Sequence, residues 1–168
     1  SIRILLDQYD EAQQWVSQLK DVFGPERLFV EVMNHGIDIE KKLVPGQLMM
    51  AKHMGLRLVA TDDSHYARRS DAKHHEEMLC IQSGARMSDK PTDQGGRRFT
   101  FAGDQYYVKS NRHMSSLFPE DDFPGALSNT LLVTEMASDI AVTFNPHLRP
   151  YPKICLLYTS PSPRDKRQ

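Results

Sequence analysis

A strand–helix–strand pattern between residues 28 and 61 constrains the fold of this chain more than any other feature of its sequence. Residues 28–33 and 56–61 are two short, β-prone apolar runs. Between them, Pro45 is expected at the start of a helix of about ten residues, and Gly55 is expected at its end. Two strands joined by a helix form a parallel pair, so the sequence predicts an α/β fold.

Further helices are predicted on both sides of this unit. Residues 8–23 carry apolar side chains at helical spacing, and Gly24-Pro25 ends that helix. A second helix begins at Ser70 or Asp71 and runs to about Gln82. A short helix is expected at 111–118. A longer one follows, with one apolar face formed by Ala126, Thr130, Val133, Ala137 and Ile140.

The aromatic residues between 99 and 108 predict a small hairpin around Gly103-Asp104 that covers the core. Arg97, Arg98 and Lys109 lie nearby, and arginine mixed with aromatic residues is also typical of a nucleic-acid surface. Both interpretations of this stretch stay open from the sequence alone.

Composition favours one globular domain that works in a reducing compartment, provisionally the cytoplasm. The 168 residues are 39% hydrophobic and 26% charged. Two cysteines, Cys80 and Cys155, predict no disulfide framework. The apolar run at residues 1–6 is far shorter than the roughly 20 residues of a membrane span. A formal net charge of −1 gives no basic footprint of the kind that predicts nucleic-acid binding.

The last 15 residues differ in character from the rest of the chain. Pro161 and Pro163 disfavour regular structure, which predicts a disordered tail. Residues 155–165, C-L-L-Y-T-S-P-S-P-R-D, resemble the translation of a sequencing-library adapter. We therefore expect residues 154–168 to be adapter-derived and to play no part in the fold.

Polar residues follow both predicted strands. Asn34-His35-Gly36 follows the first, and Asp62-Asp63-Ser64-His65 follows the second. Active sites in parallel α/β folds lie at these strand ends, and Asp with neutral His suits divalent ions such as Zn²⁺ or Mn²⁺. A polar turn that caps the next helix would use the same residue types, so spacing alone leaves both interpretations open.

Two further residues have competing interpretations. Glu31 interrupts an apolar strand, so its carboxylate needs either a structural hydrogen bond or a place near a metal cluster. His75 belongs to a His-His-Glu-Glu run that is most simply a solvated helix face, although His75 itself is a candidate for a buried role. Cys80 is expected to be a core thiol.

A series of short motifs runs through residues 9–152. They are F-G-P-E-R-L-F-V-E-V-M-N-H-G at 23–36, L-V-A-T-D-D-S-H-Y at 58–66, H-E-E-M-L-C-I-Q-S-G at 75–84, R-F-T-F at 98–101, Q-Y-Y-V-K-S at 105–110, L-F-P-E at 117–120 and A-L-S-N-T-L-L-V-T-E at 126–135. In this order and spacing, the series resembles the alpha subunit of bacterial DNA polymerase III, the replicative polymerase of the C family.

The resemblance implies a place within a larger fold. Residues 1–85 would be the C-terminal part of the polymerase-and-histidinol-phosphatase (PHP) domain, a distorted (β/α)₇ barrel with metals at the C-terminal face of its strands. Residues 86–153 would be the end of that domain and a connector toward the polymerase palm, including the hairpin and helices. The upstream ligands and the palm aspartates would lie outside this chain.

The resemblance also assigns residues. The D-x-H motif of the family falls on Asp63 and His65, which would be metal ligands. Asp62 stands where the family usually has Asn. Glu31, His35, Asp62 and His75 would contact the ligands or be purely structural.

The metal implied at this site is Zn²⁺ or Mn²⁺, with Mg²⁺ at a polymerase site elsewhere. The function implied is DNA replication by a DNA-directed DNA polymerase with a PHP 3′–5′ exonuclease. Its partners would be DNA, deoxynucleotides, the sliding clamp and other holoenzyme subunits, with no membrane, and the isolated fragment is expected to be inactive. Two alternatives are a non-catalytic PHP scaffold that docks a proofreading subunit and a stand-alone PHP phosphoesterase.

Overall fold

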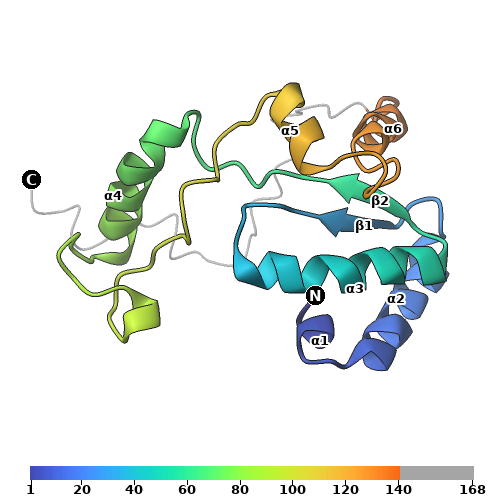
Figure 1. The fold of residues 1–168 in the computed structure, drawn as a ribbon, viewed down its shortest axis with the longest axis horizontal. Helices are drawn as coiled ribbons and strands as arrows, with labels where there is room; N and C mark the ends of the chain where they lie inside the picture. Colours follow the sequence, from blue (N-terminus) through green and yellow to red (C-terminus); the bar gives the residue numbers. More distant parts are fainter. Residues whose placement is uncertain (141–168) are drawn as a thin grey trace, which may run out of the picture. The chain divides into compact units, whose positions relative to one another are not determined.

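The computed structural model describes residues 1–140. Ser1–Met136 form one compact unit, and Ala137 begins a second. In chain order the elements are α1 (Ile2–Leu5), α2 (Tyr9–Phe23), β1 (Phe29–Val32), α3 (Asp38–Met54), β2 (Arg57–Ala60), α4 (Ala72–Ser83), α5 (Asn111–Leu117) and α6 (Ser128–Met136) (Figure 1). Short 3₁₀ turns lie at Arg69–Asp71 and Thr92–Gln94. The prediction for the tail at 154–168 lies outside the described residues.

The β1–α3–β2 unit is the parallel pair that the sequence predicts. Val30 pairs with Leu58 and Val32 with Ala60 in parallel register, and α3 packs against both strands. The other edge of β2 is bound by the segment that leads into α6. There the amide of Ala60 donates to the carbonyl of Ala126 at 2.9 Å, and the side-chain amide of Asn129 donates to the carbonyl of Leu58 at 2.9 Å.

Helix α3 begins two turns earlier than predicted. Pro45 was expected at its first turn, but α3 starts at Asp38 and Pro45 lies inside it. Asp38 and Glu40 in the first turn favour a helix start because carboxylates stabilise the positive end of the helix dipole. Pro45 costs the helix one backbone hydrogen bond without ending it. Gly55 ends the helix as expected, with a left-handed φ of 63°.

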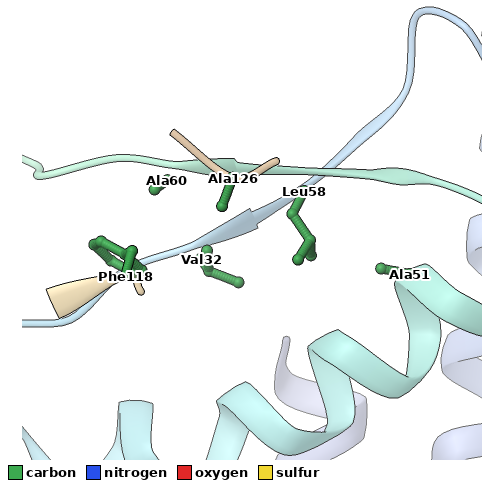
Figure 2. Close-up of a cluster of buried hydrophobic side chains, with 6 residues drawn as sticks. All are labelled: Val32, Ala51, Leu58, Ala60, Phe118 and Ala126. Carbon is green, nitrogen blue, oxygen red and sulfur yellow. The ribbon is translucent and has the colours of Figure 1, made fainter. Parts of the chain in front are cut away.

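The core lies between the two strands, α3 and the chain around α5 and α6. Figure 2 shows its six buried side chains, which are Val32, Ala51, Leu58, Ala60, Phe118 and Ala126. Phe118 is 2% exposed, and its ring meets that of Phe123 edge-on at 5.2 Å. This cluster fixes the carboxyl ends of β1 and β2, where the polar residues follow. Cys80 is buried elsewhere, on α4, as the sequence predicts.

Two predictions for the second half of the chain were wrong. The expected hairpin at 99–108 is absent from the described residues, where only isolated bridges occur, between Tyr66 and Tyr107 and between Pro91 and Arg98. Tyr106 and Tyr107 bond instead to the chain that follows β2, which removes the hairpin's second strand. Helix α6 is shorter than expected, since it ends at Met136 while the predicted apolar face continues to Ile140, and Val133 on that face is 41% exposed.

Helix α2 matches its prediction in extent but leaves much of its apolar face uncovered. Trp15 and Val22 are 59% and 74% exposed. An apolar groove of about 620 Å³ runs between α2 and β1, lined among others by Trp15, Leu19, Val30 and Met50. We call it the β1 groove. Within the described residues, β1 pairs only with β2, so its other edge faces this groove without a partner strand.

The core assignment predicts that Phe118→Ala destabilises the chain far more than Phe23→Ala. Deleting the buried Phe118 ring leaves a cavity that costs about 3–5 kcal/mol, whereas Phe23 is 53% exposed and its loss should cost less than about 1 kcal/mol. Urea unfolding followed by circular dichroism measures both free energies of unfolding. Equal losses for the two variants would contradict the assignment.

Candidate metal centre

Asp62 lies two residues after the end of β2, and its carboxylate is held in an ion pair with a buried lysine. The side chain of Lys109 has no solvent exposure, and that of Asp62 is 17% exposed. Nζ of Lys109 donates to Oδ1 of Asp62, while the backbone amide of Lys109 donates to Oδ2 at 3.2 Å. The hydroxyl of Ser64 also donates to Oδ2, at 2.8 Å. Asp62 therefore ties the end of β2 to a segment 47 residues away.

Burial by itself would raise the pKa of Asp62, because a buried carboxylate loses its hydration. The hydrogen bonds from Lys109 and Ser64 outweigh that effect and hold the pKa below its usual value. The carboxylate of Asp62 is thus fully engaged by its hydrogen bonds with Lys109 and Ser64.

Asp63 has a left-handed backbone, and its side chain is more exposed than that of Asp62. Its φ is 39°, a region that non-glycine residues enter rarely but that Asp tolerates better than most. Its side chain is 49% exposed, and its Oδ1 lies 4.0 Å from Nδ1 of His65. The two predicted ligands therefore lie side by side at the exposed end of β2.

The orientation of His65 is fixed by a short hydrogen bond. Nδ1 donates to the backbone carbonyl of Asp63 at 2.7 Å. In the neutral ring this leaves the lone pair on Nε2, the form in which histidine binds a metal through one nitrogen while the other is anchored. The ring also contacts Phe101 and His75, with centroids 4.6 and 5.4 Å away.

His35 follows β1 and is buried against the same loop. Nδ1 of His35 lies 2.6 Å from Oε1 of Glu40, and Nε2 lies 3.0 Å from the backbone carbonyl of Asp62. Its ring stacks on Tyr106 with centroids 4.2 Å apart, and Tyr106 meets His65 edge-on at 5.9 Å. The structure thus brings together the polar residues that follow the two strands, with His35 buried against the loop that follows β2.

Glu31 and His75 lie to either side of this arrangement. Glu31 is exposed rather than buried, and Thr61 donates a hydrogen bond to its carboxylate at 2.8 Å. The carboxylate of Glu31 thus has a structural hydrogen bond. Because its side chain is exposed, burial alone would not require one. His75 lines a cavity of about 190 Å³ together with Tyr66 and Phe101. Burial, and then the nearby His65, lower the pKa of His75.

Asp63 and His65 fit a divalent ion in type but not in number. A carboxylate and a neutral imidazole suit Zn²⁺ or Mn²⁺. Among the described residues, however, no group of three or more His, Cys, Asp or Glu side chains is arranged to hold a metal. The pair can supply two ligands of a site, and the others must come from elsewhere.

Lys109, Glu40 and Tyr106 are the participants that sequence reasoning missed. Lys109 was noted only as a cation near two arginines, yet it ends the apolar run Tyr106-Tyr107-Val108. A lysine in such a run needs a carboxylate partner if it is buried. That signal was present, but nothing in the local pattern named Asp62 as the partner.

Comparison with known proteins agrees with the motif series. The chain is 44% identical over 133 residues to the DNA polymerase III subunit alpha of Saccharopolyspora erythraea, a match that covers 79% of this chain and 11% of the relative. The chain is homologous to DNA polymerase III alpha subunits. The subunits of Mycobacterium tuberculosis and Thermus aquaticus are 35% and 34% identical to it, over 88% and 79% of this chain and 12% and 10% of their own lengths.

The chain therefore spans about a tenth of the length of the DNA polymerase III alpha subunits that it matches. No family model matches it. None of the helices in the described part of the chain is long and apolar enough to cross a membrane.

The Asp62–Lys109 pair in this alpha-subunit homologue predicts a pH-dependent contribution to stability. Because the folded-state pKa of Asp62 is lowered, the pair stabilises the fold above the unfolded-state pKa of about 3.9. That contribution is lost as the pH falls through the folded-state value. Asp62→Asn should lower the free energy of unfolding at pH 7, and the difference from wild type should shrink as the pH falls from 5 toward 3. Urea unfolding across that range measures it, and a difference that does not change with pH would contradict the pairing.

Proposed function

We propose that this chain is part of the PHP domain of a replicative DNA polymerase III alpha subunit, and that Asp63 and His65 bind a divalent metal ion used in 3′–5′ exonuclease proofreading. The observation that carries the proposal is the strand-end pair itself. A carboxylate and an imidazole that is anchored through Nδ1 follow β2, with Oδ1 of Asp63 4.0 Å from Nδ1 of His65. They do so in a chain homologous to these subunits.

Each residue has a defined task in this proposal. Asp63 supplies an anionic oxygen ligand, and His65 supplies Nε2, with its ring orientation held by the carbonyl of Asp63. When bound, Zn²⁺ or Mn²⁺ would supply the Lewis acidity that activates water and polarises a phosphodiester. The remaining ligands come from other parts of the parent protein.

The β1 groove supports a (β/α)₇ barrel in the complete protein. Parallel strands in such folds are paired on both sides, whereas β1 has one partner within the described residues. The groove beside its other edge is apolar and is lined by exposed side chains of α2. A neighbouring barrel strand from the parent chain would pair with β1 and cover these side chains. In this scheme residues 1–85 complete the barrel, and residues 86–153 close the domain and lead toward the palm.

The parent protein's other properties follow from the same proposal. It would polymerise deoxynucleotides on DNA with Mg²⁺ at a separate palm site, and it would work in the cytoplasm with the sliding clamp and other holoenzyme subunits. A stand-alone PHP phosphoesterase fits less well, because the match to the polymerase subunits covers 79–88% of this chain and so continues far beyond the D-x-H motif.

A non-catalytic scaffold that docks a proofreading subunit is the second candidate. One observation favours it, which is that the Lys109–Asp62 pair and the His35–Glu40 contact give the strand-end residues structural partners within the protein. The two candidates differ in whether Asp63 and His65 bind an ion.

The exonuclease proposal predicts that Asp63→Ala and His65→Ala remove metal binding and proofreading but spare polymerisation. A suitable protein is the full-length S. erythraea subunit in which residues 1–140 of this chain replace the matching segment. Each variant should lose at least about ten-fold in Mn²⁺ affinity and a larger factor in 3′–5′ exonuclease rate, with the polymerase rate within about two-fold of the parent.

Asp104→Ala is the matched control for this experiment. Asp104 is an exposed carboxylate paired with Arg69, so its removal should leave both metal binding and exonuclease activity intact. A parent chimera without exonuclease activity or Mn²⁺ binding would favour the scaffold. The 168-residue chain alone should show neither activity, and nuclease activity in it that Asp63→Ala abolishes would contradict the need for further ligands.

The barrel proposal predicts that β1 is protected in the full-length protein and exposed in the isolated chain. Backbone amides of Phe29–Val32 should exchange hydrogen at least about ten-fold more slowly in the chimera than in the 168-residue chain, because a second strand would pair with them. Peptides from α4 serve as the internal reference. Hydrogen exchange with mass spectrometry measures both, and equal protection of β1 in the two proteins would argue against a strand in the groove.

A further inference from the structure

Three aromatic rings from separate parts of the chain line the cavity beside α4. Tyr66 comes from the segment after β2, His75 from α4 itself, and Phe101 from the stretch that was expected to form a hairpin. The cavity measures about 190 Å³, which is below the roughly 300–1,000 Å³ of sites for drug-sized ligands. Its size therefore suits a single planar ring system better than a whole nucleotide.

The three rings contact one another without stacking. His75 lies 5.4 Å from Tyr66 and 5.1 Å from Phe101 between ring centroids, with 46° and 57° between the ring planes. Stacked rings are nearly parallel, as His35 and Tyr106 are at 17°. The rings in the cavity thus do not cover one another face to face, and a ring face that lines a cavity can stack on a planar ligand.

Polar groups beside these rings can bind the edge of such a ligand. The hydroxyl oxygen of Tyr66 accepts from the amide of Tyr106 at 3.2 Å, so its own proton stays available for donation. Among the described residues the ring of His75 makes no hydrogen bond, and a neutral imidazole offers one donor and one acceptor. Glu76 also lines the cavity and binds Arg98 through Oε1, which leaves its other oxygen to accept. Aromatic faces combined with donors and acceptors are typical of sites for unpaired nucleobases.

The segment that supplies most of the cavity is more basic than the chain before it. Residues 66–101 contain seven Lys and Arg against five Asp and Glu, whereas residues 1–65 contain seven against ten. Lys73 lines the cavity, is exposed, and has no ion pair within the part of the chain that the structure describes. A cation in this position suits a phosphate group of a nucleic-acid backbone.

We propose that the cavity beside α4 binds one unstacked nucleobase of single-stranded DNA, with a backbone phosphate at Lys73. The base lies against the rings of Tyr66, His75 and Phe101, and its edge bonds to the polar groups beside them. A base in a duplex is paired and stacked and cannot enter such a cavity, so the site selects single strands. The inference rests on the proposed function for the presence of DNA in the parent protein, and it requires no metal at Asp63 and His65.

The test compares two decamers of equal charge, one of deoxycytidine and one of abasic sugars. The 168-residue chain is titrated into each fluorescently labelled strand at low salt in EDTA, and fluorescence anisotropy measures the two affinities. The chain should bind the deoxycytidine strand at least about five-fold more tightly, which is the effect of stacking one base on aromatic side chains. Because EDTA removes divalent ions, neither metal binding nor exonuclease activity contributes to the result.

Four substitutions locate the effect, with circular dichroism to confirm that each variant is folded. Phe101→Leu keeps an apolar side chain without the ring, and His75→Ala removes the imidazole; each should lower the ratio of the two affinities by at least about half. Lys73→Met should weaken binding to both strands equally and reduce the salt dependence by about one unit of slope. Phe99→Ala is the matched control, because Phe99 is 51% exposed beside Phe101 but does not line the cavity, and it should leave the ratio unchanged.

The outcomes separate this inference from the function on which it rests. Equal affinities of the wild-type chain for the two strands overturn the inference, and this comparison decides alone if a variant does not fold. A preference that survives both Phe101→Leu and His75→Ala also overturns it, because the base would then lie elsewhere. A chimera without Mn²⁺ binding or exonuclease activity refutes the proposed metal function and leaves the base-dependent affinity measured in EDTA unaffected.

Discussion

The ion pair between Lys109 and Asp62 is the interaction on which the candidate site depends. Two charges are removed from water, which is costly, and the cost is offset because the ammonium and the carboxylate each have further hydrogen-bond partners. Removing one partner of such a pair typically costs about 3–5 kcal/mol, since the other charge stays buried without compensation. The pair therefore fixes which chain segment lies beside the end of β2.

The remaining polar contacts extend this arrangement to β1 and α3. His35 contacts the carbonyl of Asp62 on one side and Glu40 on the other, so the start of α3 is linked to the loop after β2. Tyr106 lies between His35 and His65 and accepts hydrogen bonds from the loop amides through its carbonyl. The apolar core beneath positions both strand ends, and the polar contacts above it orient the side chains that follow them. Asp63 and His65 are left as the outward-facing members.

Local signals in the sequence predicted the elements but not the contacts between distant segments. The parallel β1–β2 pair, the helix end at Gly55, and the strand-end position of Asp63 and His65 all follow from patterns a few residues long. The start of α3 was mispredicted because proline is typical of a first helical turn. That signal at Pro45 was given more weight than the acidic residues before it. The hairpin was mispredicted because Tyr106 and Tyr107 have the same β-prone character whether they pair with their neighbours or with Tyr66. The Asp62–Lys109 partnership spans 47 residues, and periodicity carries no information about such pairs.

Anomalous X-ray diffraction from crystals of the full-length chimera grown with Mn²⁺ tests the central claim most directly. The account predicts an anomalous peak within about 2.0–2.3 Å of a carboxylate oxygen of Asp63 and of Nε2 of His65, with Asp62 still bound to Lys109 and outside the coordination sphere. Mn²⁺ bound in the same domain with no contact to Asp63 or His65 would contradict the account. Mn²⁺ bound through Asp62 in place of Asp63 would also contradict it.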